Sequence, residues 1–187
     1  MTLRHSLAFA CLIVPAAAFA QSATAPTAPT CSALSYRGLD FLVGDWRIVE
    51  TANGKLFATN KVRRENDGCA IREDLAMVGG ARGLSLNFYL PSDGIWHTIY
   101  HDSGGHFAHL TGALANGRHQ VGGQVRLPHD PARLRNVRQV TDRNSAGLPH
   151  QVGYLEDEKG SWSVLYDVTF CPAAPAAPAS SHGRPCS

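Results

Sequence analysis

The stretch "DFLVGDWRIVE" at residues 40–50 places a glycine and an acid inside an apolar run, directly before a tryptophan. Gly44 has no Cβ, so it permits a bend or bulge that other residues resist. Asp45 can accept a hydrogen bond from a backbone amide at such a bend. We therefore interpret the stretch as the first strand of a β-barrel. We predict that Trp46 points inward and buries its ring at the closed end.

The rest of the chain repeats short segments that alternate apolar and polar residues, separated by turns rich in Gly, Asn and Asp. This pattern is typical of antiparallel strands joined by tight turns. After the segment at 41–50, the predicted strands are 55–65, 69–77, 84–90, 95–101, 106–114, 118–127, 132–142, 149–156 and 161–170. Residues 32–39 could form one or two helical turns. We predict an all-β fold, an antiparallel up-and-down barrel of about ten strands with a short N-terminal helix, because closure removes unpaired sheet edges.

The chain of 187 residues divides into one predicted domain and its flanking segments. Residues 1–20 combine a basic start, an apolar stretch and a small-x-small end, which is typical of a cleaved signal peptide. Residues 21–30 and 172–187 lack large apolar side chains that would offset the entropy of ordering, so we predict a disordered linker and a disordered Pro/Ala-rich tail. The barrel domain is then 31–171, in a periplasmic or secreted protein.

The charge pattern of the chain argues against a nucleic-acid partner. The formal net charge is +2, and no basic stripe carries interleaved aromatic residues. The densest basic cluster fits the solvated face of one strand; it consists of Arg133, Arg135, Arg138 and Arg143. We therefore predict no nucleic-acid partner. We also predict no membrane span, because the N-terminal apolar run is shorter than the roughly 20 residues that a spanning helix needs.

Four cysteines follow the predicted signal peptide, namely Cys31, Cys69, Cys171 and Cys186. An even number in an exported chain indicates disulfide bonds, and the residues alone leave the connectivity open. The chain has no CxxC spacing, so nothing supports a zinc site of the finger type. Bridged cysteines would also leave no thiolate nucleophile.

Five motifs in order resemble a group of exported bacterial proteins of unknown function with lipocalin-like, or calycin-type, barrels. They are Cys31, "DFLVGDW" at 40–46, "GCAIRE" at 68–73, "GLSLNFY" at 83–89 and "WHTIYHDSGG" at 96–105. The closing strand "GSWSVLYDVTF" at 160–170 is similar as well. The resemblance implies a lipocalin-like barrel and a Cys31–Cys69 bridge, with Cys171–Cys186 as the second. The chain departs from the group at Leu42 and Tyr100, where tryptophan is usual.

Histidines crowd one predicted hairpin, at His97, His101, His106 and His109. A four-residue loop at 102–105 would set His101 opposite His106 and leave His109 on the other face. A catalytic zinc needs three protein ligands, so this arrangement does not predict a metal site. We interpret the hairpin as a solvated tip.

Glu73 is the strongest candidate for chemistry. It shares a strand face with Ile71 and Leu75, which should point inward, and a lone carboxylate there needs a partner or has a raised pKa. The sequence leaves open which face of the next strand lines the lumen: Ser85 and Asn87, or the leucines and phenylalanine between and beside them.

We hypothesise that the barrel binds a small, mostly apolar ligand. The predicted pocket or floor residues are Trp46, Glu73, Asn87, Trp96 and Tyr100. One alternative is an enzyme that uses Glu73 as acid or base, and another is a filled-barrel envelope interaction protein. We assign no catalytic residue, metal or cofactor. The chain has no nucleophile elbow or phosphate-binding loop, and its last strand lacks the histidine by which some calycin-like barrels hold haem.

Overall fold

The structure is a computed structural model, and it describes residues 31–173 and residue 186. The predicted signal peptide at 1–20 and the predicted linker at 21–30 lie outside the described residues, as does most of the predicted tail at 172–187.

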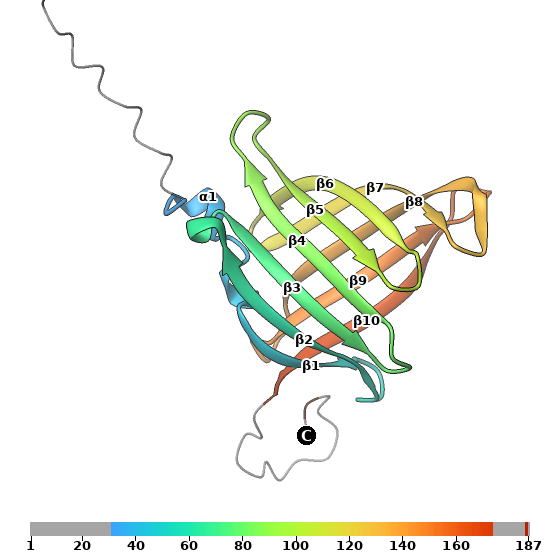
Figure 1. Cartoon of the computed structure of the whole chain (residues 1–187), viewed down its shortest axis with the longest axis horizontal. Helices are drawn as coiled ribbons and strands as arrows, with labels where there is room; N and C mark the ends of the chain where they lie inside the picture. The colour runs from blue at the N-terminus through green and yellow to red at the C-terminus, as the bar shows by residue number, and fades with distance from the viewer. Residues whose placement is uncertain (1–30, 174–185, 187) are drawn as a thin grey trace, which may run out of the picture.

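Ten strands form a closed barrel in which every pairing is antiparallel. Each strand pairs with its neighbours in the chain, and β1 pairs with β10 to close the cylinder (Figure 1). The strands are β1 Gly44–Glu50, β2 Leu56–Glu65, β3 Ala70–Met77, β4 Arg82–Leu90, β5 Ile95–Asp102, β6 Phe107–Ala115, β7 Arg118–Leu127, β8 Asp130–Arg143, β9 Pro149–Glu156 and β10 Trp162–Pro172. The predicted all-β, up-and-down barrel of about ten strands is therefore confirmed.

Short helical turns gather at one end of the barrel. The predicted N-terminal helix is present as the single turn α1, Leu34–Arg37, and the 3-10 turn η1, Asp40–Leu42, leads from it into β1. A further 3-10 turn, η2, Asn66–Gly68, joins β2 to β3. Figure 1 shows α1 beside this β2–β3 turn. We refer to this end as the closed end.

Two disulfides tie the ends of the domain to the barrel. Cys31–Cys69 joins the segment before α1 to the residue just before β3, and the two cysteines are 38 positions apart in the sequence. Cys171–Cys186 joins β10 to a residue 15 positions later. Both are the pairs that the family resemblance implies. Bridges of this kind stabilise a fold by about 2–4 kcal/mol each, mainly by restricting the unfolded chain.

An apolar core fills the closed end. Its buried members are Leu39, Leu42, Ile48, Ala58, Val62, Ile71, Trp96, Val168 and Phe170. Trp46 packs against this core, with its ring edge-on to Phe170 at 6.2 Å between centroids. The indole Nε1 donates to the carbonyl oxygen of Leu42 at 2.7 Å, which satisfies the polar atom of this largely apolar ring. Trp46 therefore packs at the closed end, although its ring is only partly buried.

Gly44 has the unusual backbone predicted for it, with a φ of +155°, whereas Asp45 acts differently from the prediction. Gly44 begins β1 in regular register with β2, and the register shift lies later, between Ile48 and Val49. A Cβ at Gly44 would lie 3.1 Å from the Trp46 ring, so close approach of the indole explains the glycine. Asp45 accepts a hydrogen bond from the Arg63 guanidinium at 2.6 Å, rather than from a backbone amide.

The predicted register of the β5–β6 hairpin was wrong. His101 lies opposite Phe107, not His106, and Ile99 lies opposite His109. The backbone N–H of Asp102 donates to the carbonyl oxygen of His106 at 3.1 Å, so the loop between these residues is 103–105, one residue shorter than predicted. Asp102 also caps this turn, because its Oδ1 accepts from the backbone N–H groups of Gly104 at 2.9 Å and His106 at 3.0 Å. His109 consequently shares the outer face with His97, and the two rings contact each other at 3.0 Å between Nδ1 of His97 and Nε2 of His109.

The arginines of β8 do not form one solvated face. The Arg138 guanidinium lies between the rings of Tyr154 and Trp162, at 4.9 and 4.8 Å from their centroids. Arg143 lies 4.9 Å over the ring of Phe41 at the closed end. Their cations are engaged by aromatic rings, which the strand pattern alone could not reveal because the rings come from other elements.

We expect Gly112→Ala to destabilise the barrel by about 1–3 kcal/mol, because overpacking forces the backbone to shift. A Cβ at Gly112 would lie 2.0 Å from the carbonyl oxygen of Gln120 on β7. The matched control is Gly122→Ala, whose Cβ would lie 3.2 Å from its nearest neighbour. Urea denaturation measures both, and equal midpoints for the two variants would contradict the close approach of β6 and β7.

Candidate functional site

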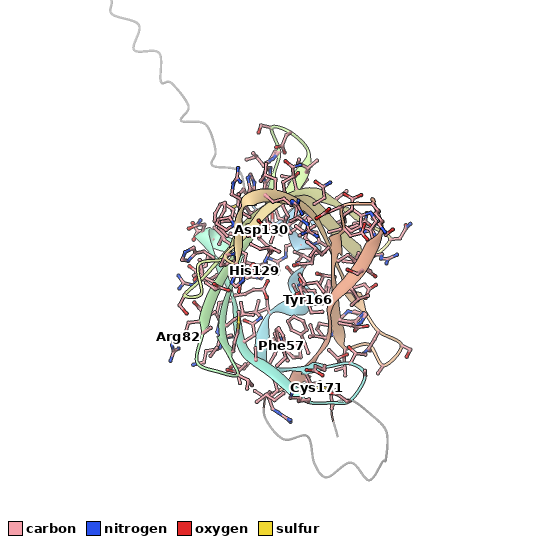
Figure 2. The ribbon with its side chains drawn as sticks, turned by 90° about the vertical axis from the view of Figure 1, so that its right-hand side faces the viewer. Phe57, Arg82, His129, Asp130, Tyr166 and Cys171 are labelled. Carbon is pink, nitrogen blue, oxygen red and sulfur yellow. A yellow bond between two sulfur atoms is a disulfide. The ribbon has the colours of Figure 1, made fainter. Side chains whose placement is uncertain are left out.

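A cavity of about 310 Å³ lies inside the barrel, in the half remote from α1. Its wall is mainly apolar, with side chains such as Ile48, Leu75, Met77, Leu110, Val125 and Val168. Figure 2 looks into the barrel and shows Phe57 of β2 and Tyr166 of β10 on its inside, where their rings lie 6.5 Å apart. Phe107 and Leu165 border the cavity while remaining 56% and 54% exposed, so they form an apolar rim at its mouth.

Glu73 lies on the wall of this cavity and is 5% exposed. It points inward from β3 because it alternates with Arg72 and Asp74, which pair with each other outside. Its Oε2 accepts from Nδ2 of Asn60 at 2.7 Å, and its Oε1 accepts from Nδ2 of Asn87 at 2.8 Å. These amides come from β2 and β4, the two neighbours of β3.

The polar face of β4 is the inner one. Ser85 borders the cavity, and Asn87 is 2% exposed behind Glu73. The Thr98 hydroxyl on β5 donates to Oδ1 of Asn87 at 2.6 Å, which fixes the orientation of that amide. Leu84 is instead 36% exposed on the outside. Asn60, Glu73, Asn87 and Thr98 therefore form one buried network across four consecutive strands.

Burial raises the pKa of Glu73, and hydrogen bonds from Asn60, Asn87 and Ser85 oppose this rise without cancelling it. The carboxyl group thus keeps its proton to a higher pH than an exposed glutamate does. Burial also raises the pKa of Tyr166, and the nearby charge of Glu73 adds to the effect, so the phenol stays neutral. The Tyr166 hydroxyl donates to Oε1 of Gln139 at 2.8 Å, over Gly153 of the intervening strand β9.

A second polar group lies at the mouth. The Tyr100 hydroxyl donates to Oδ2 of Asp102 at 2.8 Å, and Nδ1 of His106 lies 3.0 Å from the same carboxylate. Burial tends to raise the pKa of Asp102, but the hydrogen bonds from His106 and Tyr100 outweigh burial and lower it. Burial and the bond to Asp102 raise the pKa of Tyr100. Asp102 is therefore an ionised carboxylate, 5% exposed, beside a neutral phenol.

The structure separates the predicted pocket residues into three places. Glu73 and Tyr100 border the cavity, and Asn87 supports Glu73 from behind. Trp96 is 3% exposed in the closed-end core, and Trp46 packs against that core. Neither tryptophan borders the cavity.

Several site residues were missed by sequence reasoning. Asn60 carried a readable signal, because it alternates with the apolar residues Ala58 and Val62 in a predicted strand. Asp102 was placed in the loop, and its inward direction follows from the corrected hairpin register. The contact between Tyr166 and Gln139 joins strands that are not neighbours, so no local pattern indicates it.

One histidine is buried away from the cavity. His119 on β7 is 1% exposed, and its ring meets Trp96 edge-on at 5.5 Å between centroids. Its Nε2 has no hydrogen-bond partner among the described residues. Burial lowers the pKa of His119 to about 4, so the imidazole is neutral at neutral pH.

Metal binding and membrane insertion are the remaining features of the described residues. In the part of the chain described, no three His, Cys, Asp or Glu side chains are grouped so that they could hold a metal ion. The helices found in residues 31–173 are too short to cross a membrane. No protein-family model matches the chain, and a search of curated proteins finds no match.

We expect Glu73→Gln to gain stability relative to the wild type as the pH rises. Above its ordinary pKa of 4.5 the unfolded Glu73 ionises while the folded one keeps its proton, so the wild-type free energy of unfolding falls with increasing pH. Glutamine, which resembles the protonated acid, lacks this loss. Urea denaturation from about pH 5 to about pH 8 measures the difference. A difference that stays constant with pH would refute a raised pKa, and Glu65→Gln at an exposed position is the control.

His119 should make the free energy of unfolding depend on pH in the opposite direction to Glu73. As the pH falls from its ordinary pKa of 6.5 to the folded value of about 4, the unfolded histidine binds a proton that the folded one does not. The free energy of unfolding should therefore fall by about 3 kcal/mol over this interval. His119→Gln should remove most of that loss, while the exposed His129→Gln should leave it intact. Equal acid sensitivity of the two variants would show that another group is responsible.

Proposed function

We propose that the protein is an exported, lipocalin-like barrel that takes one small, mostly apolar molecule into its lumen. The observation that carries this proposal is the cavity of about 310 Å³, which lies at the lower end of the range of ligand sites. Ligand pockets combine an apolar wall with a few fixed polar groups, and this cavity offers Glu73, Ser85, Tyr100 and Gln139 on such a wall.

Location outside the cytoplasm supports the same function. Two disulfides in one small domain suit an oxidising compartment, and the residues at 1–20 have the pattern of a signal peptide. The five motifs that resemble exported lipocalin-like proteins agree with this location. These observations support a proposed location in the periplasm or outside the cell.

The alternatives fit the cavity less well. A barrel that serves purely as an interaction protein would have its lumen filled by side chains, whereas this lumen has room for a ligand. An enzymatic role for Glu73 is favoured by its raised pKa, since a general acid needs a proton near neutral pH. A Glu73→Gln variant that binds the natural ligand without converting it would establish that role.

Native mass spectrometry of the protein purified from its own compartment tests the proposal directly. We expect a mass increment that disappears on denaturation, together with an extractable small apolar molecule. Purified protein should also bind the neutral probe N-phenyl-1-naphthylamine, whose fluorescence rises on transfer to an apolar site. Absence of both signals would refute ligand uptake.

We expect Ala108→Trp to weaken binding of this probe at least about tenfold, because the indole would occupy the lumen. Ala108 borders the cavity from β6. The control is Ala113→Trp, which places the same side chain on the exposed outer face of that strand. Fluorescence titration compares the two variants, and circular dichroism checks that both fold. Probe binding that survives in Ala108→Trp would place the site outside the lumen.

A further inference from the structure

The side chains that can carry charge around the cavity are unevenly distributed. Glu73 and Asp102 both border it and are both 5% exposed. They come from β3 and β5, so they reach the same lumen from two parts of one wall. Two carboxyl groups that water hardly reaches interact strongly with any charge placed between them.

The bordering basic side chains do not balance these acids. Among the described residues they are Arg126, Arg138 and His106. Arg126 donates to the carbonyl oxygens of Pro131 at 2.8 Å and Ala132 at 3.1 Å, so its cation is held at the rim.

The other two are also occupied. The guanidinium of Arg138 is stacked between the rings of Tyr154 and Trp162, although its buried Nε has no hydrogen-bond acceptor among the described residues. The half-exposed ring of His106 bonds Asp102 at the mouth, so it cannot serve the acid further inside. Glu73 therefore faces the lumen without a cation.

The surroundings of Glu73 are prepared for a negative charge. Two amide N–H donors, at 2.7 and 2.8 Å, approach its two oxygens from opposite neighbouring strands. Such donors stabilise the carboxylate form. Glu73 has no cationic partner among the described residues, so the effect of burial on its pKa exceeds the opposing effect of the hydrogen bonds.

A second observation points in the same direction. Asn60 is 1% exposed, and its Oδ1 has no hydrogen-bond donor among the described residues. Once Glu73 is ionised, Oδ1 of Asn60 is therefore an acceptor without a donor close to a carboxylate. An ammonium group supplies three N–H donors and no acceptor, whereas a carboxylate supplies acceptors alone.

We propose that the cavity selects apolar molecules that carry a cationic amine, with Glu73 as the counter-ion of the ammonium group. This inference rests on the proposed ligand-binding function. The apolar body of the ligand would occupy the space between Leu75, Leu110 and Val168, and its head would reach Glu73. Asp102 at the mouth favours entry of a cation and opposes entry of a carboxylate.

Binding of an alkylammonium ion then moves a proton. The protonated Glu73 carboxyl group releases its proton to solvent, and the resulting carboxylate pairs with the ammonium group. Tyr166 and Tyr100 remain neutral phenols, and the hydrogen-bonded Asp102 remains ionised. One proton at most is therefore released for each amine bound, and none for a neutral alcohol.

Ligands with the same chain and different heads test the proposal. Octylamine, 1-octanol and octanoate compete with N-phenyl-1-naphthylamine for the wild type at about pH 7. We expect octylamine to bind at least about tenfold more tightly than octanoate, with 1-octanol between them. Octanoate binding as tightly as octylamine would overturn the inference while leaving ligand uptake intact. If neither the probe nor any octyl compound binds, the proposed function itself fails.

Calorimetry and the Glu73→Gln variant test whether Glu73 is the counter-ion. Titration of octylamine in two buffers of different ionisation enthalpy should reveal proton release by the wild type, and titration of 1-octanol should reveal none. Glu73→Gln should keep 1-octanol affinity within about threefold and lose most of the preference for octylamine. Should Glu73→Gln fail to fold, the two-buffer experiment on the wild type still decides. Octylamine binding without proton release, or a preference that persists in Glu73→Gln, would refute Glu73 as the counter-ion.

Discussion

Closure of the sheet between β1 and β10 is the constraint on which the rest of the structure depends. Five residues of β1, from Trp46 to Glu50, pair with residues Val168 to Pro172 of β10. This pairing removes both edges that an open sheet would expose. It also turns one face of the sheet into the interior of the barrel. It also places Phe170 against Trp46 and Tyr166 opposite Phe57. The core and the cavity therefore both follow from it.

The two ends of the cylinder have different interiors. At the closed end, aromatic and branched side chains together with α1 and η1 leave no room for a ligand, and even a histidine is buried there without charge. Toward the mouth the inward side chains, among them Phe57, Tyr100 and Tyr166, leave a cavity between them. Core and cavity thus follow one another along the barrel axis, and Ile48 and Val168 belong to both. A change at Trp46 or Phe170 should act on folding, whereas a change at Ala108 acts on the space available to a ligand.

Alternation along strands made the fold and the direction of Glu73 predictable, because a period of two follows directly from strand geometry. The same rule could not choose the inner face of β4, since Ser85 and Asn87 are polar and the outward Leu84 is apolar, the reverse of the usual pattern. Register in the β5–β6 hairpin depended on side-chain capping by Asp102, and an error of one residue exchanged the two faces. The contact of Tyr166 with Gln139 passes over Gly153 of the intervening strand β9, so it depends on the pairing of three strands and not on the pattern within any one of them.

The buried acid is the feature that folding alone does not explain. An apolar side chain at position 73 would continue the wall formed by Ile71 and Leu75 without the cost of dehydrating a carboxyl group. Instead, amides from β2 and β4 and a hydroxyl from β5 are arranged around Glu73, and one amide oxygen there has no donor among the described residues. Polar residues placed where the strand pattern calls for apolar ones are concentrated at functional sites. A polar network that is complete on the protein side except for one cationic or donor group is what a ligand with an ammonium head would complete.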